Sequence, residues 1–224
     1  MPLPDDYVDA LNMNLPAVAR LGVMDGSQAD LAYVRAVYTG AERTLGLFDP
    51  AAGLWWRDQR FVHTGVYWSR GNGWAMAATA KLLAALPAGD PLRPELVAVL
   101  RAMAAALRPA QRADGAWGAD LLDPAHVPGP ESSGTGFLTF AIAWGVDSGV
   151  LDAATYAPVV QAAWRWLSGT ALRADGLVGF VQPEDSQPAA TTAGTTRAYG
   201  AGALVLAATE VARLTPGCRV SEVS

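Results

Sequence analysis

The segment from Trp68 to Trp74 (WSRGNGW) places two indoles, a guanidinium and an amide within seven residues. Indole faces stack on the C–H faces of sugar rings, and an arginine fork binds a carboxylate through two parallel hydrogen bonds. Glycines let the backbone approach a ligand closely, and free N–H groups at a helix start favour an anion. The segment therefore indicates a binding site for an acidic sugar, formed by Trp68, Arg70, Asn72 and Trp74.

Asp9 is the candidate acid–base group. Its carboxyl can donate and accept a proton if its pKa lies near the working pH. A position at a helix start would lower that pKa, whereas burial among aromatic side chains would raise it, and the sequence leaves this balance open. Asp is also a preferred N-cap residue, so a purely structural role is the alternative for Asp9.

Further candidates come from two other segments. Glu131-Ser132-Ser133 brings a carboxylate and hydroxyls to another predicted helix start, and Ser132 and Ser133 are candidate binding residues. Arg57 and Asp58 either line the same cleft or hold the loop that contains them. An isolated Trp is more often a core residue, and only the grouping of Trp68 with its polar neighbours favours a site.

Two sequence markers recur with a period of about sixty residues, which indicates a repeat fold. One is a turn glycine followed by apolar residues, and the other is a Gly-x-Gly segment before an apolar stretch. Successive turn glycines are 62 and 61 residues apart: Gly53, Gly115 and Gly176. The Gly-x-Gly segments are 63 and 66 residues apart and begin at Gly71, Gly134 and Gly200. We expect close packing to explain the last segment, Gly200 and Gly202.

The stretches between these markers have helical periodicity. Residues 74–86 and 136–146 are apolar on almost every side, as in helices that are buried all round. Residues 94–107 and 155–168 have one charged face and are typical of outer helices. One period before Gly71 lies Asp9, which begins a further predicted inner helix. In total the pattern predicts inner helices near residues 9, 74, 136 and 201 and outer helices near 28, 94 and 155.

Inner helices that are apolar all round need neighbours on both sides, and a closed ring of helical hairpins supplies them. The sequence therefore predicts an all-α protein, an incomplete (α/α)6 toroid with about seven of its twelve helices. We assign residues 1–214 to this single partial domain and residues 215–224 to a C-terminal tail. The open ends of such an arc would expose apolar surface, so self-association is a further expectation.

Composition excludes several classes of function. A formal charge of −5 and a pI near 4.9 argue against a nucleic-acid partner. A single cysteine, Cys218, and two histidines, His63 and His126, argue against a disulfide framework, a metal site or a metal cofactor. Both histidines are expected to be solvated loop residues. No apolar stretch is long enough to span a membrane and no signal peptide is visible at the start, so we expect a cytoplasmic protein.

Trp68-Ser69-Arg70-Gly71-Asn72-Gly73-Trp74 resembles the W-x-R-G-N-G-W signature of glycoside hydrolase family 105 and its relative, family 88. The rest of the chain follows the order of these families from about residue 5 to 214, and the chain resembles the C-terminal part of the family domain. The matching segments contain Asp9 and Met13, Gln111 to Trp117, Glu131 to Thr135, Gly179 to Pro183, and Tyr199-Gly200.

The resemblance implies an (α/α)6 toroid that hydrolyses oligosaccharides carrying a terminal 4,5-unsaturated uronic acid, without a cofactor. In these families an aspartic acid protonates C4 of the double bond, and its carboxylate then takes a proton from the water that adds at C5. The resulting hemiketal opens and releases the aglycone. Asp9 matches the catalytic residue. The implied substrate-binding residues are Met13, Arg57, Asp58, Trp68, Arg70, Asn72, Trp74, Trp117, Ser132 and Ser133.

The chain also departs from the family pattern. A second important aspartate of the family lies in the half of the ring that this sequence lacks. A histidine found before the signature in several members is replaced near Arg57-Asp58. The alternative to an active hydrolase is therefore a non-catalytic helical domain that binds acidic sugars or associates through its exposed inner helices. A sugar epimerase or terpene cyclase is disfavoured, because the chain has few histidines and no Asp-rich motif.

Overall fold

A computed structural model describes residues 7–185 and 187–214. These residues contain the seven α-helices predicted from the sequence, together with two π-helical turns and two short β-hairpins. The elements in order are α1 (Asp9–Asp25), α2 (Gln28–Thr39), η1 (Gly40–Thr44), β1 (Phe48–Asp49), β2 (Leu54–Trp55), α3 (Ser69–Ala85), α4 (Arg93–Ala110), β3 (Trp117–Gly118), β4 (Pro130–Glu131), α5 (Ser132–Asp147), α6 (Ala153–Trp166), η2 (Leu167–Ala171) and α7 (Ala198–Leu214). The tail predicted for residues 215–224 lies outside the described residues.

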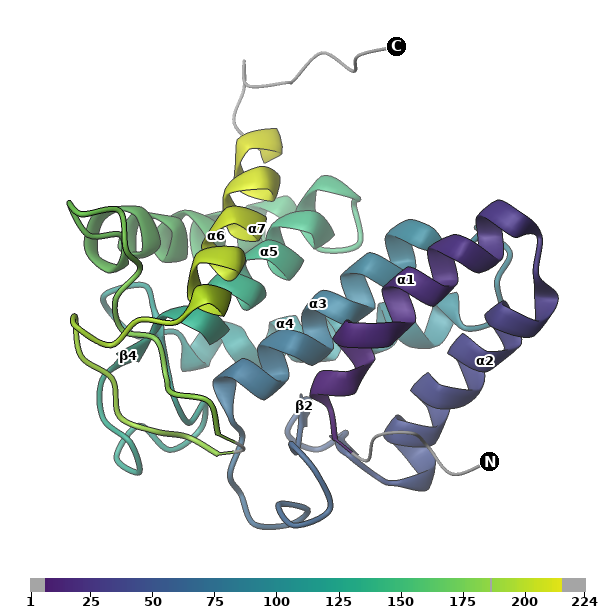
Figure 1. Cartoon of the computed structure of the whole chain (residues 1–224), viewed down its shortest axis with the longest axis horizontal. Helices are drawn as coiled ribbons and strands as arrows, with labels where there is room; N and C mark the ends of the chain where they lie inside the picture. Colours follow the sequence, from purple (N-terminus) through teal and green to yellow (C-terminus); the bar gives the residue numbers. More distant parts are fainter. Residues whose placement is uncertain (1–6, 186, 215–224) are drawn as a thin grey trace.

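The helices alternate between two layers of an α/α toroid (Figure 1). Helices α1, α3, α5 and α7 form the inner layer, in which each packs against the next along the chain. Helices α2, α4 and α6 form the outer layer, and each packs against the inner helix that precedes it. The inner and outer assignments made from the sequence are thus confirmed, and the described residues form an arc.

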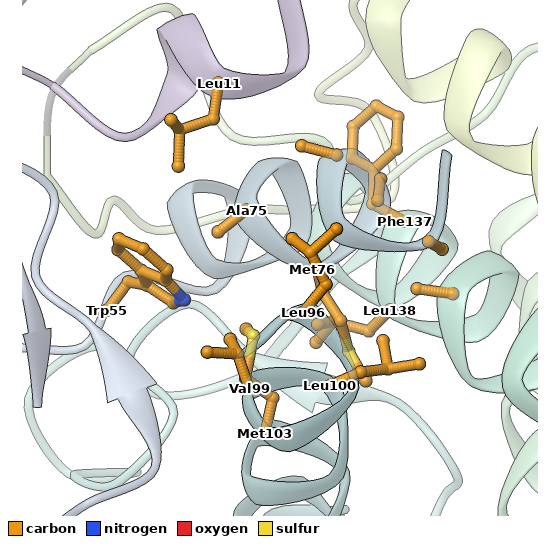
Figure 2. Packing of buried hydrophobic residues seen from close by; sticks show 14 of the residues in the cluster. Leu11, Trp55, Ala75, Met76, Leu96, Val99, Leu100, Met103, Phe137 and Leu138 are labelled. Atoms are coloured by element: carbon orange, nitrogen blue, oxygen red, sulfur yellow. The ribbon is translucent and has the colours of Figure 1, made fainter. Parts of the chain in front are cut away.

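The core lies between the two layers, and Figure 2 shows its packing where α1, α3, α4 and α5 meet. Helices α3 and α5 bury almost every residue, which explains why their sequences are apolar on every side. The end helices differ, because α1 exposes a stripe of Met13, Leu21 and Met24, and α7 exposes Val205. These faces have no helix against them among the described residues.

Two turn glycines explain the period of the sequence. Gly53 and Gly115 both have positive φ, 67° and 97°, which favours glycine. A Cβ on Gly53 would lie 2.8 Å from the Ala102 oxygen of α4, and one on Gly115 would lie 2.4 Å from the Ala162 oxygen of α6. Each turn therefore rests on the backbone of the next outer helix, and only glycine fits there.

Close approach of inner helices explains most of the Gly-x-Gly segments. A Cβ on Gly73 would lie 2.9 Å from Phe137 Cβ, and one on Gly136 would lie 2.8 Å from Ala203 Cβ. Gly200 instead packs closely against the side chain of Val181, in the loop before α7. The close packing expected for Gly202 is wrong, since a Cβ there would meet nothing within 4 Å and the residue is exposed.

Candidate functional site

The four inner helices begin at the same end of the arc, in the lower part of Figure 1. Asp9 is the first residue of α1, Ser69 and Arg70 begin α3, Ser132 begins α5, and Tyr199 lies in the first turn of α7. Hydrogen bonds join three of these starts, from Ser69 Oγ to Glu131 Oε2 (3.3 Å) and from Arg70 Nη1 to Tyr199 Oη (3.1 Å). The fold therefore gathers the predicted polar residues at one mouth.

Asp9 is half-buried, and the Oδ1 atom of its carboxyl is buried without a hydrogen-bond partner among the described residues. Burial raises the pKa of Asp9 from 3.8 to about 6, although the positive charges of Arg57 and Arg70 oppose this rise. The balance that the sequence leaves open therefore falls on the side of burial. With a pKa near 6 the carboxyl populates both protonation states close to neutral pH, as an acid–base catalyst requires.

Arg70 is 4 % exposed and lies between two aromatic rings. Its Cζ is 4.4 Å from the ring centroid of Trp68 and 4.7 Å from that of Tyr199. Its guanidinium donates to the carbonyl oxygens of Gln182 (3.2 Å) and Pro183 (2.8 Å) as well as to the Tyr199 hydroxyl. These partners are neutral oxygens, so the positive charge stays available for an anion.

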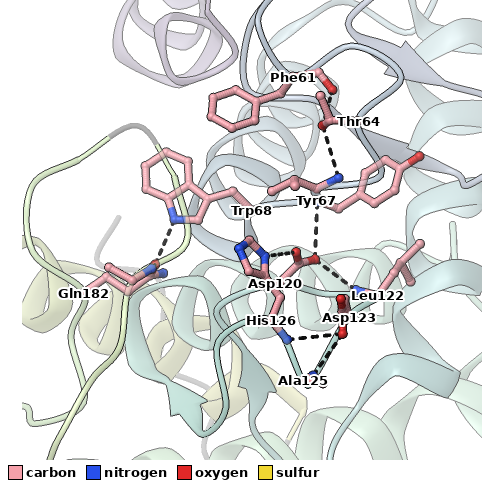
Figure 3. A network of polar contacts seen from close by, with 12 residues as sticks. Phe61, Thr64, Tyr67, Trp68, Asp120, Leu122, Asp123, Ala125, His126 and Gln182 are labelled. Carbon is pink, nitrogen blue, oxygen red and sulfur yellow. Dashed lines mark hydrogen bonds and ion pairs between the residues drawn. The ribbon is translucent and has the colours of Figure 1, made fainter.

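The two indoles of the signature have different environments. Trp68 is 2 % exposed, and its Nε1 donates to Gln182 Oε1 at 3.0 Å (Figure 3). Trp74 is half-buried against Phe137, with 3.9 Å between the ring centroids. Met13, one turn after Asp9 on α1, is 54 % exposed. Trp74 and Met13 are thus the more accessible of the apolar candidates.

Arg57 and Asp58 hold the loop before α3 against the start of α1. The carbonyl of Arg57 accepts a hydrogen bond from Val8 N at 2.8 Å, and its guanidinium lies over the ring of Tyr7. Burial alone would raise the pKa of Asp58, but hydrogen bonds from Arg60 and Arg57 outweigh it and lower the pKa to about 2. This ion pair places the positive charge of Arg57 where it acts on Asp9.

Four residues expected to bind substrate are buried and hydrogen-bonded within the protein. The carboxamide of Asn72 holds the backbone of Trp55. Asn72 Oδ1 accepts a hydrogen bond from Trp55 N (2.8 Å), and Asn72 Nδ2 donates one to the Trp55 carbonyl oxygen (2.9 Å). Trp117, Ser132 and Ser133 are at most 1 % exposed, and their side chains donate to Leu107 O, Gly179 O and Glu131 Oε1. Their positions suit the support of the loops, because burial leaves none of these polar atoms facing a ligand.

Two residues that organise the site, Glu131 and Gln182, were not among the candidate site residues predicted from the sequence. Glu131 is fully buried and caps α5, since its carboxylate accepts hydrogen bonds from Ser133 N (2.9 Å) and Gly134 N (2.6 Å). Gln182 is also fully buried and contacts Trp68, Arg70 and Glu131. The family resemblance includes the segment Gly179 to Pro183, which contains Gln182, but the sequence does not show what Gln182 contacts.

The solvated role predicted for His126 is only partly right. Its side chain is 44 % exposed, but Nδ1 lies 2.9 Å from Oδ2 of the buried Asp120 (Figure 3). Asp120 Oδ1 in turn accepts a hydrogen bond from Tyr67 N, which ties this loop to the residue before Trp68. Over residues 7–185 and 187–214, no group of three or more His, Cys, Asp or Glu side chains could hold a metal ion. In the same residues, no helix is long and apolar enough to cross a membrane.

The profile of Glycosyl Hydrolase Family 88 matches residues 5–215. The chain belongs to this family. An unsaturated 3S-rhamnoglycuronyl hydrolase from Alteromonas sp. (strain LOR) is 35% identical over 211 residues, which cover 92% of this chain and 50% of the relative. The chain thus spans about half the length of this curated relative, and it shares a glycoside hydrolase fold with it.

Solved structures of family 88 and family 105 proteins share this fold. A family 88 glycosyl hydrolase from Bacteroides vulgatus superposes with a TM-score of 0.89 at 34% identity, covering 94% of this chain and 63% of that chain. A possible family 105 member from Salmonella enterica gives a TM-score of 0.78 at 23% identity, over 92% of this chain and 56% of that chain. The family expected from the signature is therefore confirmed, with the profile match falling on family 88.

Proposed function

We propose that this family 88 domain contributes to removal of a terminal 4,5-unsaturated uronic acid from oligosaccharides of the unsaturated rhamnoglycuronyl type, with Asp9 as general acid and base. The observation that carries the proposal is the half-buried Asp9, with a pKa near 6 beside the charges of Arg57 and Arg70, whose buried Oδ1 atom has no hydrogen-bond partner among the described residues. The name of the Alteromonas relative supports this substrate class. No cofactor is required by this chemistry.

In the proposed reaction, the protonated carboxyl of Asp9 donates its proton to C4 of the enol ether, and positive charge develops at C5. The Asp9 carboxylate then removes a proton from the water that adds at C5, which restores the acid. The hemiketal formed at C5 opens, and the aglycone leaves as an alcohol. Asp9 thus ends each cycle in the protonation state in which it began.

Arg70 would bind the uronate carboxylate, exchanging one of its carbonyl partners for the substrate oxygen. Trp74 and Met13 would form an apolar wall, since both are accessible near the start of an inner helix. Asn72, Trp117, Ser132 and Ser133 would support the surrounding loops through their buried hydrogen bonds. Arg57 and Asp58 would set the charge around Asp9.

The test follows the loss of ultraviolet absorbance of the enol ether in an unsaturated disaccharide. Wild type should consume the double bond, and Asp9→Asn should lower the rate by a factor on the order of 10² to 10⁴. Asp114→Asn is the matched control, because it changes an exposed turn carboxylate that pairs with Arg112, and this variant should have the rate of wild type. Equal rates for Asp9→Asn and wild type would remove Asp9 from the mechanism.

The second candidate function is association without catalysis. The exposed stripe of α1 (Met13, Leu21 and Met24) leaves apolar surface open to a partner. We propose that two copies associate through this stripe, and Leu21→Glu should shift the gel-filtration position to that of a monomer. A wild-type chain that elutes as a monomer at every concentration would contradict this.

The cytoplasmic location also stays a prediction, which cell fractionation can check.

A further inference from the structure

Gln182 is the residue on which three inner-helix starts converge. It lies in the loop between η2 and α7 and is fully buried. Its side chain and backbone contact the starts of α3, α5 and α7. A buried glutamine has two donors and two acceptor positions in its carboxamide, and each left without a partner would destabilise the fold.

The carboxamide of Gln182 fixes the indole of Trp68. Its Oε1 accepts a hydrogen bond from Trp68 Nε1 at 3.0 Å (Figure 3). The same oxygen accepts a hydrogen bond from Ala189 N at 2.8 Å. Its Nε2 lies 3.5 Å from Ser69 Oγ. An indole has a single hydrogen-bond donor, so this hydrogen bond uses the one polar group by which the ring can be oriented.

The backbone of Gln182 extends the same network. Its carbonyl accepts hydrogen bonds from Arg70 Nη1 at 3.2 Å and from the Tyr199 hydroxyl at 2.5 Å. Its N–H donates to Glu131 Oε1 at 3.2 Å. The guanidinium of Arg70 thus rests on an indole and a carbonyl that the same glutamine holds in place.

We infer that Gln182 is a positioning residue for the uronate site, which acts through Trp68 by holding the indole against which the Arg70 guanidinium lies. This inference rests on the proposed function for its kinetic consequence, but not for its structural one. Loss of the carboxamide leaves the Trp68 donor without its acceptor in a buried position, so the indole and the guanidinium above it gain freedom. Substrate binding should therefore weaken more than turnover.

The first experiment observes Trp68 without requiring activity. The protein is labelled with 5-fluorotryptophan, and the ¹⁹F resonance of Trp68 among the eight tryptophans is identified by its absence in Trp68→Phe. Gln182→Met should shift or broaden this resonance. The matched control is Gln111→Met, which removes a second carboxamide that donates to Gly115 O (2.9 Å) and Val159 O (3.0 Å). This control should leave the Trp68 resonance in place.

The second experiment measures KM and kcat with the unsaturated disaccharide. Gln182→Met should raise KM by about tenfold, with kcat within about threefold of wild type, as expected for loss of one buried hydrogen bond that serves binding. In a Trp68→Phe background, which has no indole donor, Gln182→Met should raise KM by less than about threefold. Gln111→Met should leave KM unchanged.

The outcomes separate the two proposals. An unchanged Trp68 resonance in a folded Gln182→Met variant, or the same KM increase with and without the Trp68 indole, would overturn the positioning role. A shifted resonance in a wild-type background that shows no turnover would support the positioning role and count against the proposed function. If Gln182→Met does not fold, Gln182→Asn, which shortens the side chain by one methylene, serves for the same resonance measurement.

Discussion

The guanidinium of Arg70 lies 4.4 Å from the ring of Trp68, two residues before it in the chain. Both residues are nearly buried, and they donate hydrogen bonds to neutral oxygens of the loop before α7 and of Tyr199. A cation that lies on an aromatic face and donates to neutral acceptors keeps its attraction for an anion. The segment WSRGNGW thus positions a positive charge that can bind an anionic ligand. It also joins the start of α3 to the loop before α7.

Asp9→Asn should make the protein more stable at neutral pH. The folded-state pKa of Asp9 is raised from 3.8 to about 6, so its favourable contribution is fully present below pH 3.8 and is lost as the pH rises through 6. Asparagine has no such loss, and the free energy of unfolding should exceed that of wild type at pH 7.5 by up to about 3 kcal/mol. Urea unfolding at pH 4 and pH 7.5 measures this. A difference between the two proteins that does not change with pH would contradict the assigned pKa.

Arg57→Met should raise the pKa of Asp9 further. Burial is the main cause of the raised pKa, and the charge of Arg57 is the largest influence that opposes it. If catalysis needs protonated Asp9, the fall of kcat/KM at high pH should move to higher pH in this variant. Arg112→Met is the control, because Arg112 pairs with the exposed turn residue Asp114. If the fall of kcat/KM moved to lower pH in Arg57→Met, Arg57 would not be lowering the pKa of Asp9.

Glu42→Gln should stabilise the protein at alkaline pH. Burial raises the pKa of Glu42, and the hydrogen bond and charge of Glu95 raise it further, in a pocket of about 530 Å³ between η1 and α4. Glu42 Oε2 and Glu95 Oε1 have no hydrogen-bond donor among the described residues, and a proton on Glu42 would supply one. Because the pKa is raised, the contribution of Glu42 is present below pH 4.5 and is lost at higher pH, as the pH rises through the folded-state pKa.

Thermal unfolding from pH 5 to pH 9 tests this. The melting temperature of wild type should fall relative to that of Glu42→Gln as the pH rises, whereas the two should be similar at pH 5. Asp175→Asn, which changes a carboxylate that is 47 % exposed and paired with Arg173, provides the surface control. If wild type gains stability relative to Glu42→Gln at pH 9, the raised pKa assigned to Glu42 is wrong.

Gly115→Ala should be more destabilising than Gly176→Ala. Both glycines have positive φ, 97° and 82°, so both substitutions incur a backbone cost of about 1 kcal/mol. Only at Gly115 would the new Cβ also overlap a backbone oxygen, that of Ala162 at 2.4 Å, and relief of that overlap adds about 1–3 kcal/mol. Urea unfolding of the two variants gives the difference directly. Equal losses would mean that the turn does not rest on α6.

The sequence was sufficient to predict the helices and their layers. The spacing of Gly53 and Gly115 reflects a contact that recurs once per hairpin, and α3 and α5 are apolar all round because helices cover them on both sides. Contacts that recur in each hairpin produce a periodic pattern of residue types in the sequence, so this part of the fold could be predicted from the sequence alone.

The candidate site was predictable only in part, because residue type does not reveal which way a side chain faces. Asn72 and Trp117 were expected to contact substrate, but their polar atoms bond to buried backbone groups. The pKa of Asp9 depends on burial and on charges 48 and 61 positions away in the sequence, which no local pattern specifies. The role of Gln182 depends on three helix starts that meet only in the folded chain.

The turn glycines also describe a geometric fitting between one hairpin and the next. Gly53 receives the carbonyl of Ala102, with the methyl of Ala106 close by, and Gly115 receives the carbonyl of Ala162. Gly176 has the same backbone form, yet a Cβ there would meet no atom within 4 Å among the described residues. A helix that packed on Gly176 as α4 packs on Gly53 and α6 on Gly115 would place a backbone carbonyl, flanked by small side chains, against this glycine.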